Sequence, residues 1–465
     1  MNQPDILDAL VVGGGIVGLM VARELLHMGL RVRLVDKAFS GPIRTHVGEM
    51  AHMGGDVPTT ALYAHSLQCW AEVSTRYGSD MGLAVRGTLD LANSAGRATM
   101  LSGEAQAETG TPYAATWVAN GEALATHAGT PLGPTVRGGK WWAEAPVLST
   151  HTALETLRRD LTAKGLLIWG QDDVIDLLME GDRITGIRIA GGETALAKHT
   201  ILTTGNSVGR LLKKAGPHLP LRPARTHVLT LSGGDEVGFP VLVHRLRRGH
   251  VWMKRTREGP VMLAYDGIMD PLQATFSQKP DDKIVAALTQ HAGQLIPALA
   301  NATCTATSIQ TAAVTPDFKP VLGAWADLKG LIIATGFGAR NYVYAAGAAR
   351  LVGQIIKGEQ TKVDVGPFAP NRFMVGGWQK VEHPPGLAWK EPLQSAQPQL
   401  VGGQKQTDFM DNVQLVEKPE AKFASNVKQV EKKMVTAASS AKAKEEKPTN
   451  SLFPNSKVKM ASVSR

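Results

Sequence analysis

Short apolar runs followed by glycine turns and helical stretches recur along the first part of the chain. Residues 9–12 form an apolar run that leads through several glycines into an apolar helical stripe at residues 19–28. A second strand-like run, residues 31–35, ends at an acidic residue. Residues 200–203 and 331–335 form two further runs, and each leads through a Thr-Gly pair into a helical segment. This pattern predicts three strand–turn–helix units.

The remaining pattern alternates helix-like and strand-like stretches. Apolar positions at helical spacing predict helices at residues 62–77, 152–164 and 282–299, with Thr150 as the N-cap of the second. Residues 94–139 show little periodicity, so we assign no element there. Short apolar runs predict strands at residues 85–92, 166–169, 174–179, 184–190, 226–231, 250–254 and 261–265. A Glu-Gly-Asp turn joins the third and fourth of these strands into a hairpin.

The hydrophobic pattern ends near residue 376. From residue 380 onward the chain is rich in Lys, Gln, Ser, Pro and Ala, and fourteen basic residues outnumber nine acidic ones. Because too few apolar residues remain to form a core, we predict a flexible basic tail at residues 376–465. A helix at residues 414–435 would suit a protein partner, so a partner that binds the tail is a hypothesis.

The first glycine turn has the features of a site for an adenine dinucleotide. Gly13 permits the tight turn out of the strand, Gly15 lets a pyrophosphate approach the backbone, and Gly18 lets the helix pack closely. The helix N-terminus offers N–H groups and partial positive charge to the phosphates. Asp36 lies 18 residues after Gly18, where a carboxylate can bind ribose hydroxyls. The expected contacts are Gly13, Gly15, Ile16, Val17, Gly18, Asp36 and Lys37.

Composition limits the class of protein. No apolar run approaches the roughly 20 residues that span a bilayer. The first strand begins almost at residue 1, which leaves no space for a secretory signal. The two cysteines, Cys69 and Cys304, form no CxxC pair, which suits a reducing compartment. We therefore expect a cytoplasmic protein without a transmembrane segment.

Charge and motifs argue against several other functions. More than half of the net charge of +9 lies in the tail, and no basic-aromatic platform accompanies it, so we expect no nucleic-acid partner. The 13 histidines form no HExxH motif and no His/Cys cluster with zinc spacing, so no metal site is expected. Neither a phosphate loop of the GxxxxGK type nor a GxSxG turn is present. A second GxGxxG motif for NAD(P)H is also missing.

Five elements taken together resemble the D-amino-acid oxidase family of FAD enzymes, which includes glycine oxidase, sarcosine oxidase and the D-amino-acid dehydrogenases. The elements are the first glycine turn and residues 200–206, 315–323, 331–337 and 366–373. The resemblance implies an α/β fold in which a discontinuous Rossmann-like FAD-binding domain accompanies a substrate domain built on a mixed β-sheet. It assigns residues 1–57, 150–215 and 318–375 to the FAD-binding domain, and residues 58–149 and 216–317 to the substrate domain.

The resemblance also implies further contacts to the cofactor. The turn that begins near residue 335 would meet the flavin ring, and a helix N-terminus there would stabilise negative charge on the reduced ring. Some relatives attach FAD through a histidine in the loop after the second strand, and His46 or His52 would then be the attachment point. The further cofactor contacts implied are Thr45, His46, Val174, Thr204, Gly205, Gly336, Phe337, Gly338, Ala339, Arg340 and Asn341.

The sequence departs from the family where the substrate would bind. Many relatives that oxidise amino acids carry an arginine five residues before the Asp of the Thr-Pro-Asp motif, and this chain has Ala312 there. Either the substrate lacks a carboxylate at that place, or another arginine binds it, with Arg340 the first candidate and Arg222 and Arg225 weaker ones. Val343 stands where relatives have a basic residue that activates oxygen.

Aromatic residues complete the candidate substrate site. His250 and Trp252 lie on a strand that matches one lining the substrate face in relatives, although packing in a core explains them equally well. Tyr342 could donate a hydrogen bond to the substrate. The candidate catalytic residues are therefore Arg340, Trp252, His250 and Tyr342.

We interpret the chain as an FAD-dependent amine or amino-acid oxidase or dehydrogenase. Hydride transfer to flavin N5 would convert the C–N bond of a small-molecule amine or amino acid to an imine. Two other functions stay open: a flavin monooxygenase that uses NAD(P)H, and a flavoprotein subunit that keeps little or no activity in a larger complex.

Overall fold

The computed structural model describes residues 6–37, 47–170, 172–213, 215–216, 218–233, 240–246, 249–256, 259–266 and 280–373. The tail predicted at residues 376–465, and Thr45 and His46 in the loop after the second strand, lie outside these residues. Among the described residues, none of the helices is long and apolar enough to cross a membrane.

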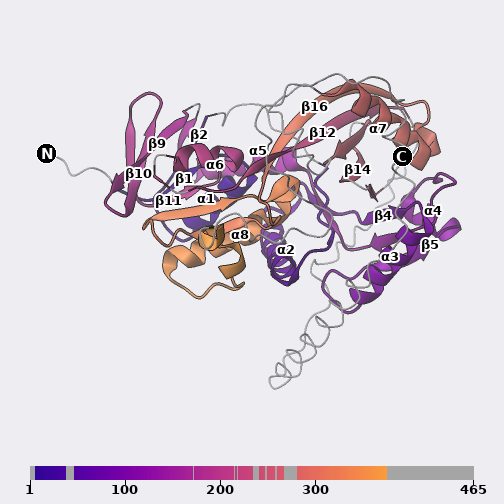
Figure 1. Ribbon diagram of the computed structural model, residues 1–465, viewed down its shortest axis with the longest axis horizontal. Coiled ribbons are helices and arrows are strands. Elements are labelled where there is room, and N and C mark those ends of the chain that lie inside the picture. Colours follow the sequence, from indigo (N-terminus) through magenta and orange to yellow (C-terminus); the bar gives the residue numbers. More distant parts are fainter. Residues whose placement is uncertain are drawn as a thin grey trace, which may run out of the picture. The chain divides into compact units, whose positions relative to one another are not determined.

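The first sheet carries the glycine turn at the end of its central strand. Its strands, in spatial order, are β17 (Val321–Ala324), β18 (Leu331–Thr335), β11 (Thr194–Leu202), β1 (Leu7–Val12), β2 (Val32–Asp36) and β8 (Leu167–Gly170). All neighbours on this path are parallel except β17 and β18. A hairpin of β9 (Val174–Glu180) and β10 (Arg183–Ile189) pairs with β11 (Figure 1). The carboxyl ends of β1, β11 and β18 therefore lie at one edge of the sheet.

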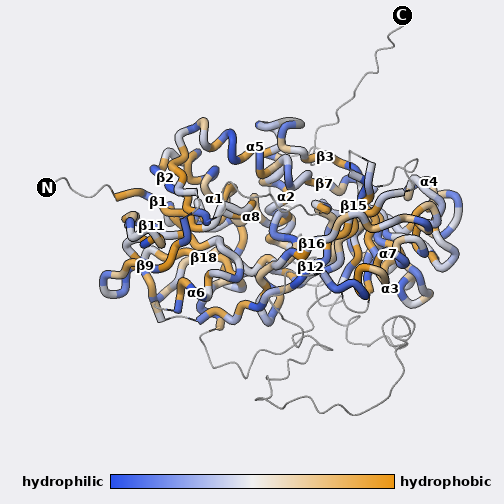
Figure 2. Tube along the Cα trace, turned by 90° about the horizontal axis from the view of Figure 1, so that it is seen from above, coloured by the Kyte–Doolittle hydropathy of each residue, from blue (hydrophilic) through white to orange (hydrophobic). Residues whose placement is uncertain are grey.

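Apolar side chains cover both faces of this sheet. Along β1, Ala9 and Val11 enter one hydrophobic core, whereas Leu10 and Val12 enter another. Burial on both faces explains why the strand reads as a continuous apolar run instead of an alternating one. Figure 2 shows the same hydrophobic character along the strands around β1 and β18.

Helices pack closely on one face of the first sheet. They are α1 (Ile16–His27), α2 (Val57–Tyr77), α5 (Thr150–Ala163) and α8 (Asn341–Lys357), while the short α6 (Val208–Leu212) follows β11. The helices α1 and α2 both contact α8. A Cβ on Gly347 would lie 2.8 Å from Ser66 Cα, so only glycine permits this approach of α8 to α2. The Ser66 hydroxyl donates to the Val343 carbonyl at 2.6 Å, which fixes the first turn of α8.

The second sheet is mixed, as expected. In spatial order it contains β16 (Thr303–Val314), β12 (Arg222–Ser232), β15 (Val261–Tyr265), β14 (His250–Arg255), β13 (Val241–Arg245), β4 (Thr88–Ala92), β6 (Gly138–Trp142) and β5 (Thr116–Ala119). Only β13 and β4 pair in parallel. The helices α3 (Ala95–Ala107), α4 (Glu122–Ala128) and α7 (Asp282–Leu295) belong to this part of the chain.

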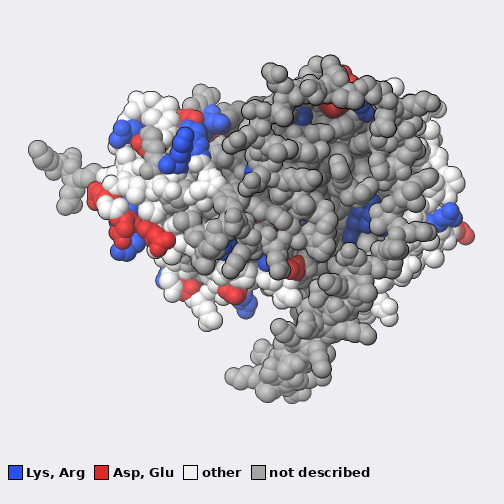
Figure 3. All heavy atoms as spheres, in the orientation of Figure 1, with Lys and Arg blue, Asp and Glu red and all other residues white. Residues whose placement is uncertain are grey.

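Short elements complete the fold. Two strands, β3 (Leu83–Val85) and β7 (Pro146–Leu148), form a small sheet of their own. The 3-10 helices among the described residues are η1 (Gly78–Met81), η2 (Gly205–Ser207), η4 (Pro297–Leu299), η5 (Gly338–Arg340), η6 (Gly366–Phe368) and η7 (Pro370–Phe373). On the face drawn in Figure 3, the basic and acidic side chains of the described residues lie interspersed.

The α/β fold and the β9–β10 hairpin confirm the sequence analysis, but several elements differ. The stretch 94–139 holds α3, α4 and two strands, because its helices bury few side chains and so carry weak periodicity. Thr150 is the first helical residue and Ser149 is the N-cap. The helix predicted at 282–299 ends at Leu295, and Pro297 starts a separate 3-10 turn because proline cannot donate within a helix.

All strands of the first sheet come from residues 1–57, 150–215 and 318–375, and all strands of the second come from residues 58–149 and 216–317. The sheets meet where β12 and β16 contact η5 and where β16 contacts η2. The predicted domain boundaries agree with this arrangement of strands, and the division into domains stays a prediction.

Candidate active site

One cavity joins the three glycine turns predicted from the sequence. Its volume is about 600 Å³. The Asp36 end is lined by residues 12–16 and 35–37, and the middle by residues 172–174 and 203–207. The other end, which we call the β16 end, is lined by Thr226, Gln310, Thr311, Ala312, Ala313, Ala339, Asn341 and Tyr342. The cavity therefore runs from the end of β2 to the contact between the two sheets.

The glycine turn at the Asp36 end leaves room for a phosphate-bearing ligand. Gly13 has φ +111°, and a Cβ on it would lie 2.7 Å from Thr203 Oγ1. A Cβ on Gly18 would lie 1.8 Å from the Gly13 carbonyl oxygen, so α1 begins directly against the end of the strand. In contrast, a Cβ on Gly15 would meet no protein atom within 4 Å, and Gly15 lines the cavity. The open space beside Gly15 fits a pyrophosphate at a helix N-terminus.

Polar groups around this turn suit a nucleotide. Asp36 Oδ2 accepts a hydrogen bond of 2.7 Å from the Gly14 N–H. Arg158 also lines the cavity, and its positive charge interacts with Asp36. Gly15 is the N-cap of α1 and has no side chain to cap the helix, and no acidic residue lies in the first turn. The N–H groups of this turn can therefore bind an anion.

Hydrogen bonds connect the turn after β11, in the middle of the cavity, to the turns after β1 and β18. Thr203 Oγ1 donates to the carbonyls of Val12 and Gly13, at 2.8 and 3.0 Å. Thr335 Oγ1 donates to the Gly205 carbonyl at 3.2 Å, which links η2 to the end of β18. The predicted cofactor contacts Val174, Thr204 and Gly205 all line this part of the cavity. Side-chain hydroxyls thus hold the three turns in one arrangement.

The predicted turn after β18 contributes only part of its residues to the cavity. Ala339 and Asn341 line the β16 end, as does Tyr342. The cavity lining does not include Gly336, Phe337, Gly338 or Arg340, nor Val17 and Gly18 at the first turn. Gly336 and Gly338 have φ of +75° and +65°, so they shape the backbone of the turn.

Arg340 is paired with a buried glutamate. Its Nε lies 3.0 Å from Glu49 Oε1, and its Nη2 donates to the Ala51 carbonyl. The other oxygen of Glu49 accepts from the Tyr342 hydroxyl at 2.7 Å. Burial raises the pKa of Glu49, and the charge of Arg340 and the Tyr342 hydrogen bond oppose that rise. Burial lowers the pKa of Arg340, but Glu49 and nearby tyrosines outweigh it and raise the pKa.

A second carboxylate, Asp266, lies at the end of β15. Its Oδ1 accepts from the His250 backbone N–H at 2.5 Å and lies 3.4 Å from His250 Nδ1. Burial raises the pKa of Asp266, and the hydrogen bond to His250 opposes the rise. The charge of Asp266 adds to the rise in the pKa of Glu49. Trp252 is only 1% exposed and packs in a core with Val228, Val243 and Ala264, and the cavity lining includes neither it nor His250.

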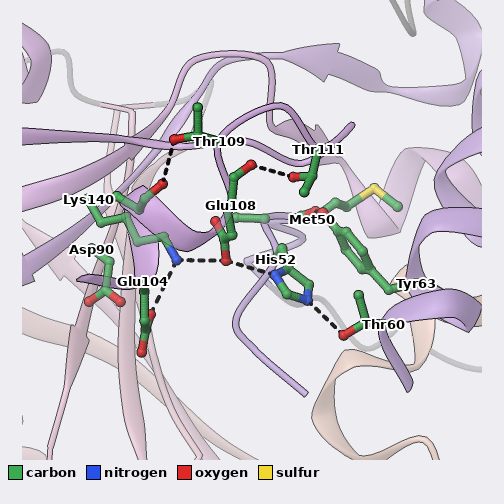
Figure 4. A network of polar contacts seen from close by, with 12 residues as sticks. Met50, His52, Thr60, Tyr63, Asp90, Glu104, Glu108, Thr109, Thr111 and Lys140 are labelled. Carbon is green, nitrogen blue, oxygen red and sulfur yellow. Dashed lines mark hydrogen bonds and ion pairs between the residues drawn. The ribbon is translucent and has the colours of Figure 1, made fainter. Parts of the chain in front are cut away.

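A buried chain of ion pairs reaches the loop that carries Glu49 (Figure 4). Lys140 is fully buried, and its Nζ lies 3.2 Å from Glu104 Oε2 and 2.8 Å from Glu108 Oε1. The same Glu108 oxygen lies 2.9 Å from His52 Nδ1. His52 Nε2 contacts Thr60 Oγ1 at 3.3 Å. The chain thus connects β6 and α3 to the loop 47–55.

The loop 47–55 supplies both partners of Arg340. Met50 is held by Tyr63, whose hydroxyl donates to the Met50 carbonyl at 2.6 Å. The ring of His52 packs between Tyr63 and Tyr113, with centroids 5.0 and 4.3 Å away. His52 is therefore held by packing and by Glu108. Attachment of FAD through His46 or His52 stays a prediction.

Sequence reasoning did not find Glu49, Thr226, Gln310 or Asp266. A signal existed for Glu49, because it is the only acidic residue between Asp36 and Asp56 and stands among apolar neighbours. For the strand residues Thr226 and Gln310, only the pairing of β12 with β16 brings them together, since they lie opposite each other across the two strands. Asp266 directly follows a strand, as polar residues often do, so no sequence pattern distinguished it.

Comparisons with known proteins show the family to which this chain belongs and the known structures that share its fold. Residues 8–355 match the family described as "DAO: FAD dependent oxidoreductase". The chain is 26% identical over 378 residues to a glycine oxidase of Pseudomonas aeruginosa, covering 77% of this chain and 97% of that one. The fold is similar to that of an L-proline dehydrogenase from P. horikoshii, with a TM-score of 0.70, 22% identity, and coverage of 81% and 100%. It is also similar to a glycine oxidase structure from Geobacillus kaustophilus, with a TM-score of 0.70, 19% identity, and coverage of 79% and 98%.

The family supplies the cofactor that the cavity fits. The space at Gly15, the helix N-terminus and the carboxylate at Asp36 are suited to an adenine dinucleotide, and the cavity continues far enough to reach the contact between the sheets. The resemblance inferred from the sequence is thereby confirmed, and the chain belongs to the DAO family of FAD-dependent oxidoreductases.

Proposed function

We propose that this protein oxidises a C–N bond of an amine or amino acid, with FAD as its bound cofactor. The observation that carries the proposal is the cavity, which joins the nucleotide-binding turn to a polar but uncharged pocket at the β16 end. The similarity to a glycine oxidase of Pseudomonas aeruginosa supports this reaction type.

The chain's own residues would hold the cofactor along the cavity. The turn at Gly13 and Gly15 and the N-terminus of α1 would bind the pyrophosphate, and Asp36 would bind ribose hydroxyls. Thr204 and Gly205 would contact the middle of the cofactor. At the other end, α8 begins at Asn341, and its N-terminus would offer partial positive charge to the flavin.

When bound, FAD would accept a hydride, that is one proton and two electrons, at its N5 atom from the carbon that bears the nitrogen. The substrate nitrogen would lose its proton to water, and the resulting imine would hydrolyse in water. The residues at the β16 end would orient the substrate and exclude water, and this reaction requires no side chain to act as a base. The small side chains of Ala312 and Ala313 leave space for the substrate there.

An anaerobic titration of the full-length protein tests the proposal. The purified protein should show the visible absorption of FAD, and a small amine or amino acid should bleach that absorption in the absence of oxygen. Bleaching by NADPH alone would instead support a flavin monooxygenase. A yellow protein that neither reagent reduces would indicate a flavoprotein without this activity, and a protein that cannot bind FAD would contradict every function considered.

The role of the tail is a separate proposal. Its basic composition is suited to an acidic surface on a protein partner, which could reoxidise the flavin. Removal of residues 376–465 should leave the anaerobic reduction of FAD unchanged, and a lost reduction would contradict this role.

A further inference from the structure

The β16 end of the cavity has no basic side chain in its lining, within the part of the chain that the structure describes. Three basic residues line the cavity elsewhere: Lys37, Arg158 and Arg210. Arg158 interacts with Asp36, and Arg210 Nη2 lies 2.7 Å from Asp173 Oδ1. The described basic side chains that line the cavity thus lie away from the β16 end. Arg222 and Arg225 are not part of the lining either.

Arg340 lies beside the β16 end, but two of its three guanidinium nitrogens already have partners. Glu49 Oε1 lies 3.0 Å from its Nε, and the Ala51 carbonyl accepts from its Nη2. Glu49 is 0% exposed, so its charge has no water to screen it and depends on this pair. To bind a substrate carboxylate through Nε and Nη2, Arg340 would have to leave a buried carboxylate without its counter-charge, which costs about 3–5 kcal/mol.

Two carboxylates already interact with Arg340. Its positive charge opposes the rise in pKa that burial causes in Glu49 and in Asp266. A substrate carboxylate would compete with these two groups for Arg340, whereas an ammonium group would not. The absence of an arginine at Ala312 acts in the same direction.

We propose that the site takes an amine with no carboxylate on the carbon that is oxidised, and that Glu49 determines this specificity by keeping Arg340 from a substrate carboxylate. The inference rests on the proposed function, because it names the substrate class of the same site. Of the two interpretations that Ala312 left open, this inference favours a substrate without the carboxylate. Arg340 is then a partner of Glu49 and not of the substrate.

Pairs of compounds that differ only in a carboxylate test the substrate class. The pairs are pyrrolidine and proline, dimethylamine and sarcosine, and benzylamine and phenylglycine, with both enantiomers of each chiral acid. Each compound is added to the FAD-loaded wild-type protein without oxygen, and the rate of flavin bleaching is measured. We expect at least one amine to reduce FAD about tenfold or more faster than its acid, a difference of about 1.4 kcal/mol. A faster reaction with the acid would overturn the inference but keep the proposed function.

Acetate binding tests the role of Glu49 without any turnover. Acetate is titrated into the FAD-loaded protein, and the visible spectrum of the flavin reports binding. We expect no spectral change in the wild type up to about 100 mM, and binding at least about tenfold tighter in Glu49→Gln because Arg340 is then unpaired. Binding by the wild type at a few millimolar would overturn the inference. This titration also decides the inference if no compound of the panel reduces FAD, a result that would contradict the proposed function.

Two further variants control the Glu49→Gln result. Glu24→Gln removes a matched carboxylate on α1, whose Oε1 lies 2.7 Å from Nε of Arg350 on α8. Neither residue lines the cavity, so this variant should not create acetate binding. Adding Arg340→Ala to Glu49→Gln should abolish the acetate binding that the single variant gains. Acetate binding that survives in the double variant would show that another group binds the carboxylate. If Glu49→Gln fails to fold, the wild-type titration and the compound pairs still decide the inference.

Discussion

At the scale of single residues, Gly15 and Gly18 lie in the same turn but have different structural roles. Gly18 is packed against the chain itself, since a Cβ would lie 1.8 Å from the Gly13 carbonyl oxygen and 2.7 Å from Thr203 Oγ1. Gly15 has free space where its Cβ would point. Gly15 therefore leaves space for a ligand, and Gly18 permits the close packing of the helix, although the GxGxxG motif alone does not distinguish the two positions.

Replacing each of the two glycines by alanine should distinguish the role in folding from the role in FAD binding. In the protein without FAD, Gly18→Ala should lower the free energy of unfolding by about 2–3 kcal/mol or more, because the backbone must move away from the new Cβ. Gly15→Ala should cost at most about 1 kcal/mol, the usual range for a change at an N-cap, yet weaken FAD binding at least about tenfold. Urea unfolding and quenching of flavin fluorescence measure the two effects. Equal loss of stability in both variants would contradict the assignment.

At the scale of elements, the buried ion pairs connect β6 and α3 to the loop that holds Arg340. Lys140 pairs with two carboxylates, and Glu108 Oε1 is shared between Lys140 and His52. Fixing His52 fixes its neighbour Ala51, whose carbonyl accepts from Arg340. An ion pair buried within the second sheet thus supports the loop beside the active site (Figure 4).

A double-mutant cycle on Lys140 and Glu108 should measure this support. Lys140→Met removes the cation that Glu108 and Glu104 share, although Glu104 keeps Arg245 as a partner. Glu108→Gln removes one anion from a buried ammonium that keeps Glu104. Each variant should therefore cost at most about 3–5 kcal/mol in urea unfolding. The double variant removes both charges and should be less destabilised than the sum of the two by more than about 1 kcal/mol. Additive effects would mean that the pair is not coupled. Hydrogen exchange at residues 47–55 should increase in the single variants if the loop depends on the pair.

The same elements show what the sequence could and could not predict. The nucleotide turn was predictable because its strand, its glycines and Asp36 lie close together in the chain and follow a local rule. The ion-pair chain was not, because Lys140, Glu108 and His52 come from three segments, and only the packing of α3 and of the loop 47–55 near β6 brings them together. The β16 end of the cavity depends in the same way on the register of β12 and β16. The missing arginine at position 312 could be recognised from the Thr-Pro-Asp motif, whereas the pairing of Arg340 with Glu49 could not.

At the scale of the whole molecule, buried histidines make stability depend on pH. His244 Nδ1 lies 3.0 Å from His291 Nε2, so one ring must donate and the other must accept, which requires that the accepting ring be neutral. Burial lowers the pKa of His244 to about 3 and that of His291 to about 4, and the charges of His291 and Arg97 further lower that of His244. Burial, with Arg225, also lowers the pKa of His227 to about 4.

These shifts predict a loss of stability between pH 7 and pH 5. The unfolded chain protonates its histidines near pH 6.5, while these three stay neutral in the folded state, so acid favours unfolding. Each could contribute about 2 kcal/mol at pH 5 as an upper limit, from 1.4 kcal/mol per unit of pKa. The carboxyls of Glu49, Asp90 and Asp266 act in the opposite direction, because burial raises their pKa and the folded state then binds protons more tightly.

Histidine variants isolate the contribution of the pair from that of the carboxyls. The free energy of urea unfolding is compared at pH 7 and pH 5 for the wild type and for the double variant His244→Asn, His291→Asn. The double variant is less stable at pH 7, but its loss between the two pH values should be smaller than that of the wild type by about 2–4 kcal/mol, because two groups no longer take up protons on unfolding. His151→Asn is the control, since His151 is half exposed beside Glu155 and should leave the pH dependence unchanged. An equal loss in the double variant and the wild type would show that the two rings are already protonated in the folded protein, or that they titrate in the folded and unfolded states alike.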